Sequence, residues 1–232
     1  AITYLSKAVK VNNQSEAALY NLATAYSKQK KFVEAERFYR QALIINPKNI
    51  MALQELGAIH MRKTQLQAAF DFYKRALDLD PNNPKTLSDI GESQRRLGFL
   101  GDAIEVLEKS LSLEPNNADT LNRFGNALYQ LGKLESAKVA FENALKINPA
   151  MSDAYISLGN IFRDMEMSID AMLAYDKALA CDQNSVVAMV NRGQLWTAAA
   201  QHQEALKAFK GACEINPDFK NLSGAILNIK LN

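Results

Sequence analysis

The sequence predicts an all-α protein built from stacked pairs of helices. Three observations support this: few residues interrupt helices, the sequence repeats with a period of 34 residues, and apolar residues recur in steps of three and four. The chain's 232 residues include only 10 Gly and 6 Pro, well below their combined share of roughly 12% in average proteins. With 48% hydrophobic and 22% charged residues, the chain has enough apolar surface to fold, which excludes a disordered or collagen-like chain.

Four sets of residues mark the 34-residue period. One set consists of prolines, one of glycines and two mainly of alanines. Because chance does not produce four registers with one period, the chain contains internal repeats. The sets are Pro47, Pro81, Pro115, Pro149 and Pro217, then Gly57, Gly91, Gly125, Gly159 and Gly193, and the series that begin at Ala1 and Ala8.

Each repeat is predicted to contain two helices joined by a short polar turn. In the first repeat, Leu19, Leu22 and Tyr26 follow one another at helical spacing. The proline comes just after the second helix, which it cannot continue. Complete repeats are predicted at 16–49, 50–83, 84–117, 118–151, 152–185 and 186–219.

The two ends of the sequence are predicted to be half-repeats. Residues 1–15 correspond to the second helix of an earlier repeat, and residues 220–232 to the first helix of a later one. We therefore expect a single solenoid that is a piece of a longer protein. Ala1, Leu5 and Ala8 form an apolar helix face whose repeat partner is missing, so we expect a homodimer through this exposed end, or fraying there.

The repeated pattern resembles the tetratricopeptide repeat. In the second repeat its characteristic places hold Leu53, Leu56-Gly57, His60, Ala69, Tyr73, Ala76 and Pro81. The resemblance covers nearly the whole chain. It implies a right-handed α-α superhelical solenoid of about six tetratricopeptide repeats with a half-repeat at each end. It also implies a scaffold whose first helices line a concave groove that binds extended segments of other proteins.

Charge and hydropathy exclude two other classes of partner. The formal net charge of +2 falls short of the basic excess that phosphate neutralisation requires, so we expect no nucleic-acid binding. Charged or amide residues interrupt every apolar run before 18 residues, so we expect no membrane span. The chain is expected to be cytoplasmic.

The sequence offers no constellation typical of an enzyme, a cofactor site or a metal site. His60 and His202 are too few and too far apart for a metal site or a triad, and His60 shares its register with apolar residues, which indicates core packing. Cys181 and Cys213 also share registers with Leu and Ile. Two reduced, buried thiols are therefore expected, with a disulfide between adjacent second helices as the alternative.

Arg192 is the clearest local conflict, because its register is otherwise apolar. A guanidinium at such a position needs a partner. Stacking on Trp196, one helical turn away, is the preferred interpretation. The alternative is a docking contact to whatever follows the end of this sequence.

The resemblance also assigns groove positions within each first helix. An Asn or Gln side chain matches the C=O and N–H groups of a peptide bond, so spaced amides predict a grip that tolerates different side chains in the bound segment. Positive and negative charges are mixed, so long-range steering should be weak. The alternative is that polar residues merely solvate this face. The candidate peptide-binding residues are Asn21, Gln54, Arg95, Asn122, Arg123, Asn126, Asn160, Arg163, Asn191 and Gln194.

The carboxylate clamp of chaperone-tail-binding repeats is not expected here. In those repeats the clamp consists of Lys, Asn and Arg residues spread over three successive repeats. The best asparagine pair, Asn122 and Asn126, is followed by Ser157, Val187 and Asn191 without the required cations. We therefore expect no tight binding of a free acidic chain terminus.

The last segment resembles the junction in SPINDLY-type O-linked N-acetylglucosamine transferases, where the last repeat runs into the catalytic region. The similar residues include Pro217, Gly224, Leu227 and Lys230. The resemblance implies that the chain is the substrate-recruiting arm of a glycosyltransferase that uses a nucleotide sugar, with no catalytic residues of its own. The competing hypothesis is a free-standing adaptor or assembly protein. Only Asn21 and Asn191 match that family's row of asparagines before the Leu-Gly pair.

Overall fold

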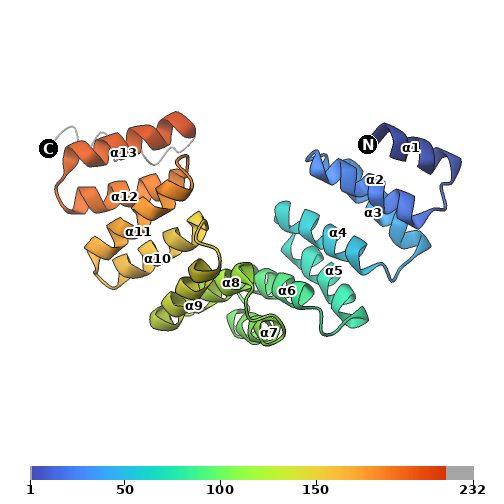
Figure 1. Ribbon diagram of the computed structural model, residues 1–232, viewed down its shortest axis with the longest axis horizontal. Coiled ribbons are helices and arrows are strands. Elements are labelled where there is room, and N and C mark those ends of the chain that lie inside the picture. Colours follow the sequence, from blue (N-terminus) through green and yellow to red (C-terminus); the bar gives the residue numbers. More distant parts are fainter. Residues whose placement is uncertain (1, 218–232) are drawn as a thin grey trace. The chain divides into compact units, whose positions relative to one another are not determined.

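The computed structural model describes residues 2–217, which form thirteen α-helices joined by short turns and contain no strand (Figure 1). The chain divides into two compact units, Ala1–Pro115 and Asn116–Asn232. The helices of the first unit are α1 (Ile2–Val11), α2 (Glu16–Lys28), α3 (Phe32–Ile45), α4 (Ile50–Arg62), α5 (Leu66–Leu79), α6 (Pro84–Leu97) and α7 (Leu100–Leu113). Those of the second unit are α8 (Ala118–Gln130), α9 (Leu134–Ile147), α10 (Ser152–Asp164), α11 (Ser168–Cys181), α12 (Val186–Ala198) and α13 (His202–Ile215).

The all-α prediction is confirmed, and the helices pair as the repeats require. Each predicted repeat holds one helix pair, from α2 and α3 in the first to α12 and α13 in the last, and the two helices of a pair make the most extensive contacts. The predicted terminal helix at 220–232 lies outside the described residues. Between residues 2 and 217, none of the helices is both long enough and apolar enough to cross a membrane.

Local sequence signals explain how the helices begin and turn. Asn49, Asn83 and Asn117 precede α4, α6 and α8, and each side-chain oxygen accepts a hydrogen bond from a backbone N–H in the first helical turn. The turn inside each pair contains one left-handed residue, with φ between 55° and 91°. Only two of these six residues are glycine. In the other four turns the sequence therefore does not indicate which residue is left-handed. The six are Lys30, Thr64, Gly98, Gly132, Glu166 and Ala200.

The repeated glycines of the first helices allow close contact with the second helices. A Cβ atom added to Gly57 would lie 2.4 Å from Cε1 of Tyr73, and one added to Gly159 would lie 2.4 Å from Cε1 of Tyr175. The other three repeats with this glycine have the same arrangement against Leu or Phe. Glycine therefore recurs at this position because the facing ring or Leu side chain occupies the space that a larger residue's Cβ atom would need.

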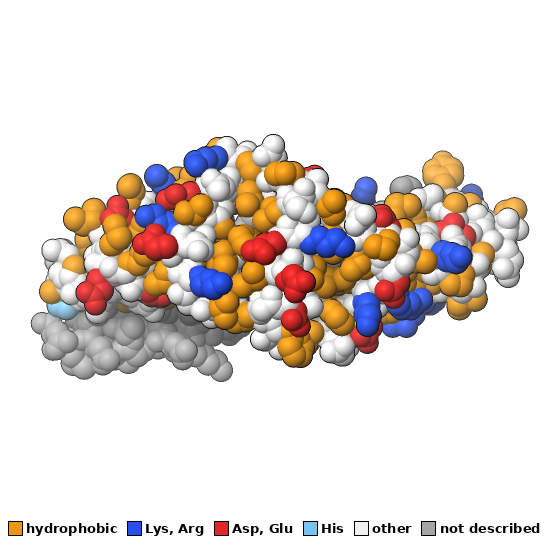
Figure 2. Space-filling model, turned by 90° about the horizontal axis from the view of Figure 1, so that it is seen from below, with side chains coloured by type: hydrophobic (Ala, Val, Ile, Leu, Met, Phe, Trp, Pro, Cys, Tyr) orange, Lys and Arg blue, Asp and Glu red, His pale blue; other side chains and the backbone are white. Residues whose placement is uncertain are grey.

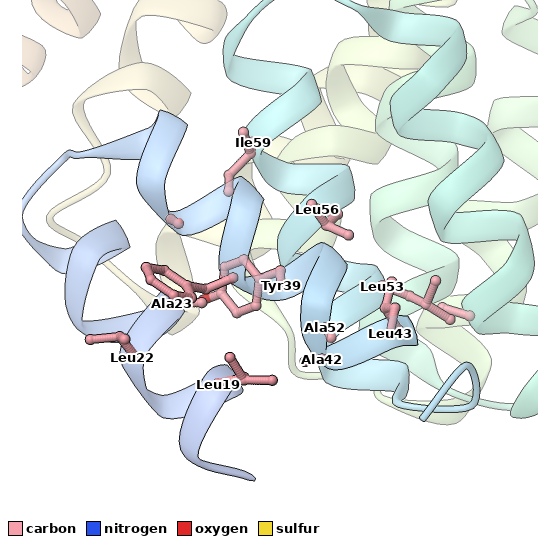
Figure 3. Close-up of a cluster of buried hydrophobic side chains, with 13 residues drawn as sticks. Leu19, Leu22, Ala23, Tyr39, Ala42, Leu43, Ala52, Leu53, Leu56 and Ile59 are labelled. Atoms are coloured by element: carbon pink, nitrogen blue, oxygen red, sulfur yellow. The ribbon is translucent and has the colours of Figure 1, made fainter. Parts of the chain in front are cut away.

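The core of the first unit is continuous across helix pairs. Leu19, Leu22 and Ala23 of α2 pack with Tyr39 of α3 and Leu53 of α4 in one buried cluster (Figure 3). Each fully buried leucine stabilises the fold by roughly 1.5–3 kcal/mol relative to an exposed one. Neighbouring repeats thus bury surface that neither could bury alone.

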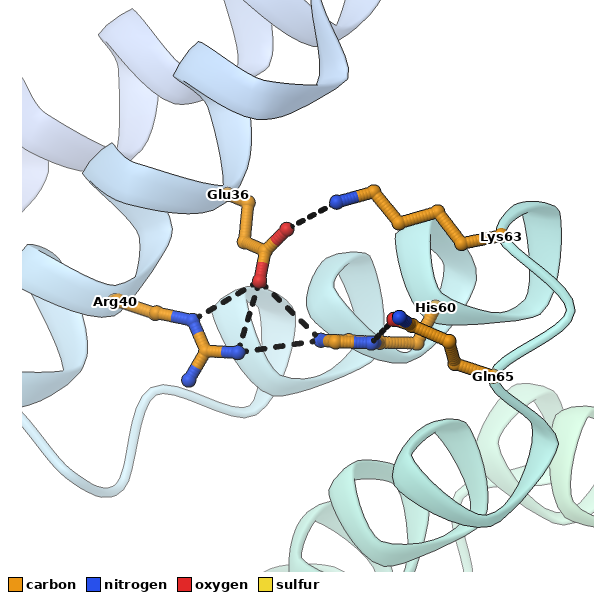
Figure 4. A network of polar contacts seen from close by, with 5 residues as sticks. All are labelled: Glu36, Arg40, His60, Lys63 and Gln65. Carbon is orange, nitrogen blue, oxygen red and sulfur yellow. Dashed lines mark hydrogen bonds and ion pairs between the residues drawn. The ribbon is translucent and has the colours of Figure 1, made fainter.

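His60 packs in the core as predicted, at 6% exposure, and also belongs to a polar network between two helix pairs (Figure 4). Its ring stacks on Phe72, with the ring centroids 5.2 Å apart, and its Nδ1 lies 2.6 Å from Gln65 Oε1. The carboxylate of Glu36 on α3 accepts hydrogen bonds from Arg40 at 2.9 Å and Lys63 at 2.5 Å, and lies 3.5 Å from His60 Nε2. This network ties α3 to the pair α4 and α5.

The expectation for the cysteines is correct in part. Both thiols are free, but Cys181 is exposed, so its predicted burial is wrong, and Cys213 is half-buried. Cys181 is the last residue of α11, and the Sγ donates to the carbonyl of Pro149 at 3.6 Å. Ile45 in this register is half-buried against the core, but the other four apolar residues that share it are 38% to 45% exposed, so apolar character here does not imply burial: Leu79, Leu113, Ile147 and Ile215.

The predicted stacking of Arg192 on Trp196 is also wrong. The Arg192 guanidinium instead forms an ion pair with Asp176 of α11, with Nη1 and Oδ1 2.8 Å apart. The pair forms because Asp176 lies on the neighbouring helix within reach of the long arginine side chain. An arginine is thereby accommodated at a register that is otherwise apolar.

Helix α1 packs on the first unit with one face left uncovered. Ile2, Leu5 and Val9 pack against the core cluster, whereas Ala8 is exposed. Ala42, which has the same register in a complete pair, is fully buried. Ala1 lies outside the described residues, and association through this face stays a prediction.

Gly193→Ala and Gly211→Ala form a matched pair in the last repeat. A Cβ atom at Gly193 would lie 2.6 Å from Cε1 of Phe209, whereas one at Gly211 meets only Met189 Sδ at 3.6 Å. We expect Gly193→Ala to destabilise the protein by about 1–3 kcal/mol through overpacking. Gly211→Ala should stabilise it by about 0.5–1 kcal/mol, because alanine favours the helix. Urea midpoints measured by circular dichroism test both, and equal midpoints for the two variants would contradict this account of the glycine register.

The Glu36 network predicts an acid-dependent part of stability. Burial raises the pKa of Glu36, but the hydrogen bonds from Lys63 and Arg40 outweigh it and hold the pKa below its ordinary value of 4.5. A carboxylate whose pKa is lowered by folding stabilises the fold above its unfolded value, and this contribution is lost as the pH falls through its folded value. We therefore expect Glu36→Gln to cost about 1 kcal/mol at pH 7.

The difference between wild type and Glu36→Gln should shrink as the pH falls below 4, when measured by urea unfolding across the acidic range. Glu34→Gln, a change on the same helix at a residue with no ion pair among residues 2–217, is the control. A difference that does not change with pH would show that the carboxylate charge is not responsible.

Candidate functional site

The first helices of the second unit lie side by side. Helix α10 contacts both α8 and α12, in addition to its own partner α11. Side chains 31 residues apart on neighbouring first helices come within hydrogen-bond distance of one another. We call the set Asn122, Asn126, Ser157, Asn160, Asn191 and Gln194 the first-helix face of this unit.

Hydrogen bonds connect four of these side chains from repeat to repeat. Ser157 Oγ on α10 donates to Asn126 Oδ1 on α8 at 3.3 Å. Asn191 Nδ2 on α12 donates to Asn160 Oδ1 on α10 at 2.9 Å. We call Asn126, Ser157, Asn160 and Asn191 the amide ladder.

Tyr175 of α11 supports the ladder from the core. Its ring is fully buried against Gly159, and its hydroxyl donates to Asn160 Oδ1 at 2.8 Å. Burial raises the pKa of Tyr175 to about 12, so the hydroxyl keeps its proton at neutral pH and remains a donor. Asn160 Oδ1 thus accepts two hydrogen bonds within the protein.

A charged group lies beside the ladder and is largely neutralised. Tyr129 OH donates to Asp164 Oδ2 at 2.5 Å, and Arg163 Nη2 lies 3.2 Å from the other oxygen of Asp164. Burial, with the added effect of the Asp164 carboxylate, raises the pKa of Tyr129. Arg163, a predicted site residue, is therefore an ion-paired rather than an isolated cation.

Three further predicted residues lie on the first helices of the second unit. Asn122 is half-buried on α8, and its Oδ1 is enclosed without a hydrogen-bond partner in the structure. Arg123 follows it on the same helix. Gln194 is exposed on α12, in the register of Asn126 and Asn160. A buried amide oxygen without a partner is costly, and with less than 1 Å² of its surface exposed the Asn122 Oδ1 atom is not open to a ligand.

In the first unit the predicted residues are not joined into a comparable ladder. Asn21 is exposed on α2 and lines a cleft of about 700 Å³ together with Tyr20, Met51 and Asn83. Gln54 also lines this cleft, but it is only 8% exposed, and its Nε2 donates to Thr86 Oγ1 at 2.6 Å.

Arg95 of α6 is likewise committed to a neighbour. Its Nη2 lies 2.8 Å from Glu92 Oε1, and its side chain is 16% exposed. Gln54 and Arg95 therefore already have partners within the first unit, which leaves Asn21 as the predicted residue there whose amide is free for a ligand.

Charged side chains at the predicted site positions form ion pairs, as Arg95 does with Glu92 and Arg163 with Asp164. On the face drawn in Figure 2, Lys and Arg side chains alternate with Asp and Glu side chains, without a large area of one sign. In the part of the chain that the structure describes, no group of three or more His, Cys, Asp and Glu side chains is placed to hold a metal ion.

Sequence reasoning missed two residues of this site. The sequence analysis named Ser157 only as evidence against a carboxylate clamp, and it did not name Tyr175. A signal for Tyr175 exists in the spacing: it follows Asn160 by 15 residues, as Tyr39 follows Thr24, and Tyr39 OH also lies 3.0 Å from the Thr24 hydroxyl.

Family models for the tetratricopeptide repeat match this chain at several places. They cover 16–49, 50–83 and 106–139, and a further model described as TPR repeat covers 125–165. Together these matches span more than half of the residues. The chain belongs to the tetratricopeptide repeat family.

Solved structures of repeat proteins are similar to this chain. A chain of the APC/C hetero-tetramer Cut9–Hcn1 is 18% identical with a TM-score of 0.88, over 98% of this chain and 45% of that chain. This tetratricopeptide repeat chain thus spans less than half the length of that neighbour. MamA is 28% identical with a TM-score of 0.60, over 72% of this chain and 97% of its own.

YrrB, described as a TPR protein with an unusual peptide-binding site, is 23% identical with a TM-score of 0.61, over 82% of this chain and 97% of its own. Among curated proteins, no match to the sequence was found. The structural similarities support the fold, a tetratricopeptide repeat scaffold of the kind typical of protein–protein interaction.

Proposed function

We propose that this tetratricopeptide repeat chain is a protein-binding scaffold that holds extended polypeptide segments along its first helices and catalyses no reaction itself. The observation that carries this proposal is the amide ladder of the second unit: neighbours hold the oxygens of Asn126 and Asn160, and their side-chain nitrogens have no partner among residues 2–217. Fixed amides can hydrogen-bond a peptide backbone whatever its side chains are.

Pre-orientation strengthens such a site. A flexible surface amide loses conformational entropy on binding, whereas Asn160 is already held by Tyr175 and Asn191. The pairing of Arg163 with Asp164 leaves little net charge beside the ladder. The segments bound best are therefore expected to be uncharged and unfolded.

Two hypotheses describe the full-length protein that contains this scaffold: it is the substrate-recruiting arm of a glycosyltransferase, or it is a free-standing adaptor. The resemblance of residues 217–231 to a transferase junction supports the first, and these residues lie almost entirely outside the described part of the chain. The similar structures named above include no glycosyltransferase. Reading the gene downstream of the Asn232 codon decides between the two: a two-lobed α/β region would support the transferase arm, and a stop codon or an unrelated domain would exclude it.

Replacing Asn122, Asn126 and Asn160 together by Ala should weaken peptide binding at least tenfold. Each lost hydrogen bond contributes roughly 0.5–1.5 kcal/mol. Binding is measured by fluorescence anisotropy with a mixture of capped, uncharged twelve-residue peptides, and circular dichroism should show unchanged helicity.

The control for this variant replaces Asn13, Asn143 and Asn184, three asparagines away from the first-helix face, by Ala. We expect it to bind the peptides as the wild type does. Unchanged affinity in the first variant, or equal loss in both, would rule out the first-helix face as the binding surface.

A further inference from the structure

The turns inside the helix pairs of the first unit carry cations and no acids. Each turn is taken as six positions, from the end of the first helix to the start of the second: 26–31, 60–65 and 94–99. The chain's 27 Lys and Arg and 25 Asp and Glu, spread evenly over 232 residues, would place about two of each sign in these eighteen positions. They hold seven cations, which we call the basic edge: Lys28, Lys30, Lys31, Arg62, Lys63, Arg95 and Arg96.

Contacts between the three turns place them side by side. Arg62 of the second turn lies over the ring of Phe32, the residue after Lys31, with its Cζ atom 5.4 Å from the ring centroid. Arg96 Nη1 of the third turn donates to the carbonyl of Met61 at 3.5 Å. The cations of the three turns therefore belong to one edge of the first unit.

Most cations of the basic edge have no acidic partner. Lys63 pairs with Glu36 at 2.5 Å, and Arg95 pairs with Glu92 at 2.8 Å. The other five are exposed and form no ion pair with any residue that the structure describes: Lys28, Lys30, Lys31, Arg62 and Arg96.

Two further acids lie near the edge. Glu34 and Asp102 stand in the first turns of α3 and α7, where the positive end of the helix dipole favours a carboxylate. Counted together with Glu36 and Glu92, they leave the basic edge with an excess of three positive charges.

Helix geometry does not require this accumulation. Lys28, Arg62 and Arg96 lie in the last turns of their helices, where the helix dipole favours a cation. However, α8 and α12 have no basic residue in the last turn and form helices of the same length as α2 and α4. Lys30 and Lys63 lie beyond the helix ends.

The second unit lacks a basic edge. Its equivalent positions are 128–133, 162–167 and 196–201. They hold two cations and two acids, so their charges cancel: Lys133, Arg163, Asp164 and Glu166. The excess of cations is a property of the first unit alone.

We propose that the basic edge docks the first unit on an anionic lipid membrane surface. Such a contact needs no helix that spans the bilayer. Four of the seven cations are lysines, which are compact charges on long flexible stems and suit a fluid array of head groups.

Exposed apolar side chains at the same edge favour a membrane over other polyanions. Phe99, in the third turn, is 56% exposed, and Val33, the second residue of α3, is 73% exposed. Peripheral membrane binding combines electrostatic attraction to anionic lipids with insertion of apolar side chains. An acidic peptide or an RNA would neutralise the cations, but only a bilayer offers an apolar layer beneath its anionic one.

The test replaces Lys28, Lys30 and Lys31 together by Gln. Their side chains make no hydrogen bond or ion pair within residues 2–217, so the fold should be unaffected. Each cation near an anionic bilayer strengthens binding about fivefold, so we expect the triple variant to bind about 100-fold more weakly. Binding is measured by flotation with phosphatidylcholine vesicles that contain about 30% phosphatidylserine.

Two further measurements separate charge from insertion. Raising the salt concentration from about 0.1 M to about 1 M shortens the Debye length from about 10 Å to about 3 Å and should release the protein. Phe99→Ser should weaken vesicle binding at least threefold and leave binding of a poly-glutamate peptide unchanged.

The control replaces Lys74, Lys207 and Lys210 by Gln. These lysines are exposed and lie outside the basic edge, so the net charge changes equally, and we expect less than a twofold change in vesicle binding. Urea midpoints should be equal for the two triple variants.

Three outcomes would overturn the inference. They are equal binding to vesicles with and without phosphatidylserine, equal loss of binding in the two triple variants, and tighter binding of poly-glutamate or poly-uridine RNA than of the anionic vesicles. The inference does not depend on the proposed function, because the peptide tests of the first-helix face use uncharged probes and alter none of the cations of the basic edge.

Discussion

The structure depends on one contact, the close approach of the two helices inside each pair. In five repeats a glycine of the first helix faces a ring or a leucine of the second at a distance that leaves no room for a Cβ atom. This contact buries a large side chain and fixes the crossing of the helices at the same time. Five of the six complete repeats use this contact, and within each unit neighbouring pairs share apolar surface.

The same contact also builds the candidate site. In the fifth repeat the residue that faces Gly159 is Tyr175, and its ring carries a hydroxyl to the neighbouring Asn160. In the fourth and sixth repeats the equivalent residues are Phe141 and Phe209, which have no hydroxyl. The side-chain oxygen of Asn126 instead accepts a hydrogen bond from Ser157 of the next repeat. In both Asn126 and Asn160 the amide oxygen is therefore bound within the protein, although by different donors.

The fold could be predicted from the sequence because its determinants are local and repeated. A Gly, Pro or Ala at a given position has the same structural role in each repeat where it occurs. Once the 34-residue period is known, the position of each helix pair follows. The exceptions were single side chains whose partners lie on another helix. Arg192 pairs with Asp176, and Cys181 is exposed at a helix end where the apolar residues of most other repeats are exposed as well.

The candidate site was predictable only at the level of residue type. The family resemblance implied which positions face the groove, and amides at those positions indicated peptide binding. Which end of each amide is free depends on Ser157, Asn191 and Tyr175, three donors from other helices. Sequence spacing does not reveal such donors, because it does not show which side chains of different helices lie within hydrogen-bond distance. Gln54 illustrates the opposite case, because its position predicted a free amide and the structure commits that amide to Thr86.

Both units contain charged and neutral hydrogen bonds between neighbouring helix pairs, and the two kinds respond differently to pH and salt. In the first unit the partly buried carboxylate of Glu36 forms ion pairs with Arg40 and Lys63 and lies close to the His60 ring, between two helix pairs. In the second unit the hydrogen bonds between first helices include the neutral pairs Ser157–Asn126 and Asn191–Asn160, and the bond from Tyr129 to the Asp164 carboxylate. Charged networks attract solvent and counter-ions, and their strength changes with pH and salt. A neutral ladder keeps its hydrogen-bonding pattern under those changes, which suits a surface that recognises an uncharged peptide backbone.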